Sequence, residues 1–91
     1  MSETFSDNKD GHRFELQVGE HLAWADYRRR DGVLVIPHVE ADMALRGGGA
    51  AGRLMAHVVE AARAEGSKIR PLCGYAAAWM RRHPEAQDLL A

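Results

Sequence analysis

The sequence predicts an α+β domain with a compact mixed sheet, in the order βββαβα followed by a C-terminal helical turn. Three patterns indicate this fold class. Residues 13–18 alternate between apolar and polar side chains, residues 33–36 are all apolar, and apolar residues recur at three- and four-residue spacing from Ala51 to Ala62. These are the periodicities of a strand with one solvent-exposed face, a strand covered on both faces and an amphipathic helix. A length of 91 residues suits one domain.

The first eleven residues are polar and end in the run Asn8–Gly11. Such a segment buries little apolar surface, so we expect a flexible N-terminal tail over 1–11 and a single domain over 12–91. The first predicted strand begins where the alternation starts. Its apolar face consists of Phe14, Leu16 and Val18.

Two hairpins are expected to connect the first three strands. Gly19-Glu20 predicts a turn into a second strand, His21–Arg29, and the Asp31-Gly32 pair favours a tight hairpin after it. The run Val33–Ile36 begins a third, central strand that extends towards Glu40.

The second half of the chain predicts helices around one short strand. The helical pattern from Ala51 to Ala62 ends at Gly66, a natural C-cap. Lys68–Leu72 is typical of a short strand and Tyr75–Arg82 of a second helix. Pro84, a favourable first helical residue, opens a final turn through Leu90.

Composition excludes several classes of function. The net charge of -1 argues against a broad nucleic-acid-binding surface. No run approaches the roughly 18 apolar residues of a membrane span, and residues 1–5 lack a signal-peptide pattern, so we expect a cytoplasmic protein without membrane contact. A single cysteine, Cys73, excludes an internal disulfide and a zinc site made of cysteine pairs. The five histidines show no metal-ligand spacing.

A glycine-rich stretch, Leu45–Gly52, could bind phosphate in three ways. A P-loop requires Lys and Ser/Thr after its last glycine, whereas Arg53 follows Gly52 here. The dinucleotide fingerprint G-x-G-x-x-G is matched by Gly47, Gly49 and Gly52, but it needs the glycines directly after a strand and a larger doubly wound sheet.

The third signature, Arg/Gln-x-x-Gly-x-Gly/Ala, is met by Arg46, Gly49 and Ala51 and is found in the GNAT superfamily of N-acetyltransferases. Small residues let backbone N–H groups approach a pyrophosphate at the positive end of a helix dipole, and Arg46 can add a charge-assisted contact. The predicted pyrophosphate-binding backbone groups belong to Gly47, Gly48, Gly49, Ala50, Ala51 and Gly52.

Three further segments extend this similarity: Ile36–Glu40, Pro71–Tyr75 and Arg81–Pro84. With the glycine turn, and in this order, they resemble the small single-domain branch of the GNAT superfamily over about residues 13 to 90. The resemblance implies a GNAT-like fold that binds acetyl-CoA in a cleft where the third and fourth strands splay apart. Pro37 and Pro71 lie near that cleft, where splaying would tolerate their missing N–H groups. Either proline alone would also be explained by a strand end.

The sequence departs from this branch at three positions. Val39 stands where Thr is usual, Ala41 where Val is usual and Gly48 where Gln is usual. Losing the hydroxyl at 39 removes any hydrogen bond from that side chain, and Gly48 should make the turn more mobile before the cofactor binds.

His38 is the candidate general base. It is expected to share a strand face with Leu34 and Ile36 at the end nearest the cleft, and an unperturbed imidazole pKa of about 6.5 suits deprotonation of an amine near neutral pH. A histidine that ends an apolar strand can equally be a satisfied structural residue.

Three other side chains have both catalytic or binding and structural interpretations. Cys73 could accept the acetyl group covalently, with its thiolate favoured by the following helix, or be a small buried hydrophobe. Tyr75 could protonate the CoA thiolate or pack its ring. Arg81 and Arg82 could contact the cofactor's phosphates or form a solvated face.

The sequence therefore predicts an acetyl-CoA-dependent N-acetyltransferase acting on a primary amine. The alternatives are a CoA- or acyl-CoA-binding sensor or accessory module, and a helix-turn-helix nucleic-acid binder, which the strand-like Lys68–Leu72 segment and the charge balance oppose. Little chain separates the first two predicted strands, so acceptor choice must come from loops, a partner or a second copy of the chain. A weak homodimer is consistent with this.

Overall fold

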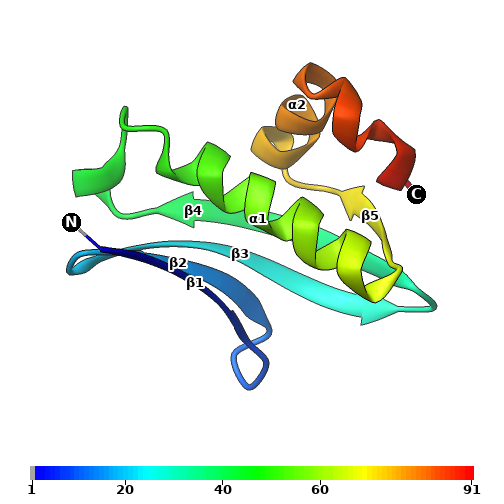
Figure 1. Ribbon diagram of the computed structural model, residues 1–91, viewed down its shortest axis with the longest axis horizontal. Helices are drawn as coiled ribbons and strands as arrows, with labels where there is room; N and C mark the ends of the chain where they lie inside the picture. The colour runs from blue at the N-terminus through cyan, green and yellow to red at the C-terminus, as the bar shows by residue number, and fades with distance from the viewer. Residues whose placement is uncertain (1) are drawn as a thin grey trace.

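The structure, a computed structural model, describes residues 2–91 and contains one five-stranded mixed sheet (Figure 1). The strands lie in chain order across it: β1 (Glu3–Asn8), β2 (Arg13–Val18), β3 (His21–Arg30), β4 (Val33–Ala41) and β5 (Lys68–Pro71). The first four pair antiparallel, and β5 pairs parallel with β4. The predicted α+β class with a mixed sheet is confirmed.

Two α-helices and two short 3₁₀ segments complete the chain. They are η1 (Met43–Leu45), α1 (Ala50–Glu65), α2 (Gly74–Arg82) and η2 (Pro84–Leu89). In Figure 1, α1 runs along the sheet and α2 lies near the β5 edge. The predicted C-cap of α1 is confirmed: Gly66 has a φ of 75°, and its N–H donates to the carbonyls of Ala62 and Arg63.

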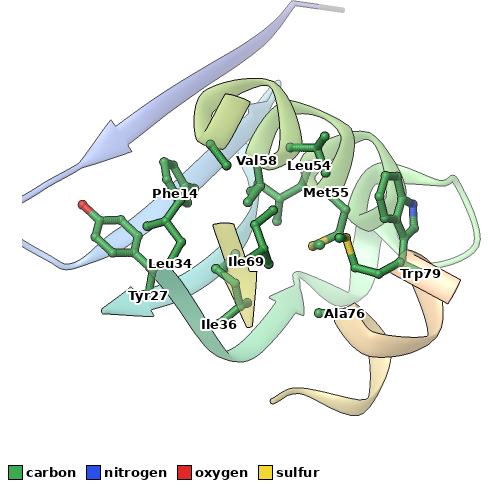
Figure 2. Close-up of a cluster of buried hydrophobic side chains, with 14 of the residues drawn as sticks. Phe14, Tyr27, Leu34, Ile36, Leu54, Met55, Val58, Ile69, Ala76 and Trp79 are labelled. Carbon is green, nitrogen blue, oxygen red and sulfur yellow. The ribbon is translucent and has the colours of Figure 1, made fainter. Parts of the chain in front are cut away.

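The core lies between the sheet and the helices (Figure 2). Alternate residues of β2 and β3 point into it, as the spacing of a strand requires. Both helices contribute to the same cluster, which includes Phe14, Leu16, Ala25, Tyr27, Leu34, Ile36, Leu54, Met55, Val58, Ile69, Trp79 and Met80. We call the sheet face that meets this core the covered face and the opposite one the open face, because no helix of the described residues packs on it.

The predicted flexible tail is wrong, because residues 3–8 form β1 at the edge of the sheet. Phe5 stacks on Phe14 and on His57 of α1, with ring centroids 5.7 and 4.8 Å apart. Polar side chains add long-range contacts: Asp7 accepts a hydrogen bond from the Tyr27 hydroxyl. Cross-strand and helix contacts therefore order a segment whose own composition predicts little structure, and the observed order is ββββαβα.

A charged cluster ties the far end of α1 to the sheet. Arg29 donates two hydrogen bonds to the Glu65 carboxylate, at 2.9 and 3.1 Å, and one to Asp7 at 3.0 Å. The hydrogen bond from Arg29 lowers the pKa of Glu65, while partial burial opposes this shift. This cluster links β1, β3 and α1.

The register between β3 and β4 contains a β-bulge that changes which side chains face the core. Asp26 pairs with His38, but Arg28 pairs with Val35, so Ile36 and Pro37 together oppose Tyr27. Leu34 and Ile36 are buried before the bulge, whereas Val39 and Ala41 pack against the core after it. The residues of β4 that face the core are therefore even-numbered before the bulge and odd-numbered after it. The expectation that Val33–Ile36 is covered on both faces is also wrong, because Val33 and Val35 are only half-buried on the open face.

Candidate active site

The glycine turn joins η1 to α1, and its backbone conformation requires glycine at two positions. Gly47 and Gly49 have φ of 83° and 81°, in the left-handed region that side chains disfavour. Gly49 is the N-cap of α1, and no side chain caps this end within the described residues. The first intrahelical bond runs from the Arg53 N–H to Gly49. The N–H groups of Ala50–Gly52 are therefore available at the positive end of the helix.

Arg53 anchors the turn. The sequence did not reveal this role, because the helical periodicity predicts only that Arg53 faces away from the core. Its guanidinium donates to the Gly48 carbonyl and to the Glu3 carboxylate of β1, both at 2.8 Å. The turn is thus connected to the opposite edge strand of the sheet.

A cavity of about 290 Å³ lies beside the turn and reaches the start of α2. It is lined by Ala41, Leu45, Arg46, Gly47, Gly49, Ala50, Ala51, Gly52 and Tyr75. Gly52 faces α2 here: a Cβ added to it would lie 3.6 Å from the Tyr75 hydroxyl oxygen, an ordinary van der Waals distance. Partial burial raises the pKa of Tyr75, and the positive charge of Arg82 partly opposes this. The phenol therefore remains protonated at neutral pH and can donate a proton.

The parallel strands β4 and β5 separate next to this cavity. Their pairing ends at Ile36 and Pro71, where the N–H groups of Leu72 and Cys73 both donate to the Ile36 carbonyl, at 3.0 and 3.1 Å. Beyond that point β4 continues to Ala41, while the chain after β5 turns into α2.

The separation leaves part of the β4 backbone without a neighbouring strand. The Asp42 N–H donates to Leu22 of β3, so alternation directs the N–H groups of His38 and Glu40 towards β3 and that of Val39 away from it. No strand of the described residues lies on that side of Val39. Its N–H is a backbone donor that sequence reasoning missed, because it depends on the register.

The comparison with protein families agrees with this geometry. The model of the GCN5-related N-acetyl-transferase family matches residues 13–89. The chain belongs to this family. Membership supports an acyltransferase-type function in general. No curated protein sequence matches the chain significantly.

His38 lies in β4 beyond the point where β4 and β5 stop pairing, but on the other face of the sheet from the one expected. The bulge at Ile36 and Pro37 turns its side chain to the open face, so it does not share a face with Leu34 and Ile36. Its Nε2 lies 2.7 Å from the Glu40 carboxylate, two residues along the same face. Glu40 therefore orients the ring.

Cys73 is the N-cap residue of α2 and is half-buried. It packs against the core cluster, and its backbone lies at the Ile36 carbonyl where the two strands separate. His38 in β4 and Cys73, between β5 and α2, thus flank the separation. The site holds a thiol at the cavity side and an imidazole on the open face.

Of the three arginines predicted to bind phosphate, only one lies beside the glycine turn. Arg46 lines the cavity beside the turn. Arg81 and Arg82 are exposed in the last turn of α2, at the end opposite Tyr75, and neither lines this cavity. The structure thus brings Arg46 but not the arginine pair to the turn.

Residues 2–91 contain no group of three or more His, Cys, Asp or Glu side chains arranged to hold a metal ion. None of the helices described combines the length and apolar character needed to span a bilayer.

Proposed function

We propose that this chain transfers an acetyl group from acetyl-CoA to a primary amine. The observation that carries the proposal is the continuity between the glycine turn, the cavity beside it and the point where β4 and β5 separate. This path leads from the backbone N–H donors of the glycine turn to the region around His38, Cys73 and Tyr75, which would supply a base, a thiol and a phenol. Family membership supports the reaction class.

The turn is the proposed binding site for the CoA pyrophosphate. The N–H groups of Gly47 and of Gly49–Gly52 would donate to its oxygens, and the side chain of Arg46 would add a charge-assisted contact. The Gly48 N–H, predicted to join them, instead donates to the Leu45 carbonyl at 3.2 Å. The cavity that runs from the turn to Tyr75 would take the pantetheine chain. The thioester would then lie between β4 and the start of α2.

The chain supplies a group for each chemical requirement of acyl transfer. His38, oriented by Glu40, accepts a proton from the attacking amine. The Val39 N–H faces the developing oxyanion. The new C–N bond forms as the C–S bond breaks, and Tyr75 gives its proton to the departing thiolate and recovers one from solvent.

Direct attack within a ternary complex is the route that we propose. The half-buried Cys73 offers a second route, in which its sulfur takes the acetyl group first and passes it to the amine. Rapid-quench mass spectrometry after mixing with acetyl-CoA alone distinguishes the two. An acetylated Cys73 peptide formed at a competent rate would replace direct attack by the covalent route.

Isothermal titration with acetyl-CoA tests the proposal first, followed by measurement of free CoA release with a panel of primary amines. We expect saturable binding and amine-dependent release. Absence of binding would refute the proposal. Saturable binding without release for any amine would favour a CoA-binding module instead of an enzyme.

A further inference from the structure

A second cavity, of about 460 Å³, opens at the β-bulge on the open face. It is lined by Gly11, His12, Asp26, Tyr27, Arg28 and Pro37. The Tyr27 ring points to the core on the covered face, so the groove lies over its backbone, between the side chains of its two neighbours. Pro37 precedes His38 in β4, and Asp26 pairs with His38 across the strands. The groove therefore adjoins the proposed base.

Two opposite charges, Asp26 and Arg28, line this groove, and Arg13 of β2 lies opposite Asp26 in the register. Among residues 2–91, neither Asp26 nor Arg28 forms a side-chain hydrogen bond or an ion pair. Arg13 with Glu15 and His38 with Glu40 form ion pairs on this face, whereas Arg30 and Arg70, which lie on the same face, also form none among the described residues. As alternate residues of one strand, Asp26 and Arg28 have Cα atoms about 7 Å apart.

We propose that the groove binds the acceptor as an amino acid, with its ammonium group at Asp26 and its carboxylate at Arg28. The orientation follows from the register, because Asp26 lies opposite His38 whereas Arg28 lies opposite Val35. The reacting nitrogen is thus held at the base, and the carboxylate is held away from it. This inference rests on the proposed acetyltransferase function.

The proton balance is consistent with this placement. Transfer forms the N–C bond and breaks the C–S bond, and the ammonium loses two protons. One of them balances the proton that the CoA thiolate gains, and the other leaves to solvent through His38. Asp26 selects the charged acceptor without itself entering the reaction, so it is a specificity-determining residue.

The test uses γ-aminobutyrate and γ-aminobutyramide, which share an amine and a chain length but differ in the carboxylate. Binding of each to the full chain, with and without CoA, is followed through backbone amide shifts at Gly11, His12, Tyr27, Arg28 and His38. Because the groove is open to solvent, we expect γ-aminobutyrate to bind about three- to fivefold more tightly than the amide.

Single substitutions test the roles of Asp26 and Arg28 separately. Arg28→Gln should remove the preference for the carboxylate, and Asp26→Asn should weaken both probes about three- to fivefold. Arg30→Gln and Asp31→Asn, at the exposed end of the same hairpin, are the matched controls and should leave both affinities unchanged.

Three results would overturn the inference: shifts that map outside the groove, no saturable shift there, or an unchanged probe preference in Arg28→Gln. Failure of the proposed function is a separate result, because it shows as absent CoA binding in the same samples. Amine-dependent CoA release that is insensitive to Arg28→Gln and Asp26→Asn would leave the acetyltransferase function standing and remove only this acceptor.

Discussion

The cavity beside the glycine turn and the groove at the bulge, on opposite faces of the sheet, differ in what lines them. On the covered face, the cavity beside the glycine turn is lined largely by backbone and small residues of Gly47–Gly52. On the open face, the groove at the bulge is lined by charged side chains, Asp26 and Arg28, beside His38. One face offers fixed backbone donors, and the other offers a pattern of charges.

This difference suggests a division of tasks between the faces. Backbone N–H groups at a helix start suit a phosphate, whose charge is the same for every acyl-CoA. Charged side chains on a strand can be exchanged without altering the fold, so the open face is the place where acceptor choice can vary. If the division holds, substitutions on one face should leave the function of the other intact.

The largest expected effect comes from His38. His38→Ala should lower kcat by about 10²- to 10⁴-fold, the usual contribution of a positioned acid–base group, while acetyl-CoA affinity stays close to that of the wild type. Steady-state CoA release with the best amine and titration with acetyl-CoA measure the two quantities. His21→Ala, an exposed histidine in β3, is the control. Equal turnover in the wild type and His38→Ala would remove this residue as the base.

The two faces should also differ strongly in how much their side chains contribute to the free energy of unfolding. Leu54 of α1 is completely buried in the core, so Leu54→Ala should lower the free energy of unfolding by about 2–5 kcal/mol. Gln17→Ala, an exposed side chain on the open face, should change it by less than about 0.5 kcal/mol. Urea unfolding followed by circular dichroism measures both. Similar losses in the two variants would contradict the assignment of a single core to the covered face.

Local sequence signals predicted most of the fold. Periodicity and turn residues gave β2, both hairpins, α1 with its C-cap at Gly66, and α2. They missed β1, because Phe5 is the one large apolar side chain in a polar segment and its partners, Phe14 and His57, come from other elements. Long-range contacts of this kind leave no local pattern.

The sequence predicted which elements carry the candidate residues better than it predicted how those residues are arranged. Glycine spacing placed the turn at the start of α1 because positive φ requires glycine. The face of His38 was wrong, since a bulge depends on the register with β3 and the only local sign was Pro37. Arg53 and the Val39 N–H were missed because their roles arise from Glu3, Gly48 and the end of β5 pairing.

A smaller effect tests the backbone character of the covered cavity. Gly47 and Gly32 have φ of 83° and 78°, and an added Cβ would meet nothing within 4 Å at either. Alanine at each should therefore cost a similar strain, about 1–2 kcal/mol of stability. Only Gly47→Ala should also weaken acetyl-CoA binding, by about tenfold, because the turn would shift away from its ligand geometry. Equal acetyl-CoA affinities in the two variants would argue against pyrophosphate binding at the turn.

The smallest effect concerns charge pairs, in which the two faces should behave alike. Glu65 on the covered side is held by Arg29, and Glu15 on the open side by Asn8 and Arg13; these hydrogen bonds lower the pKa of both carboxyls. A lowered folded-state pKa gives stability that is present above the unfolded value, about 4.3, and is lost as pH falls through the folded value.

Unfolding free energies at pH 7 and pH 3 should therefore differ less in Glu65→Gln and Glu15→Gln than in the wild type, by under about 1 kcal/mol for these partly exposed pairs. Glu20→Gln, at an exposed hairpin position, is the control and should keep the wild-type difference. A change confined to Glu65→Gln would mean that only the Arg29 cluster between β1, β3 and α1 stabilises the fold through charge.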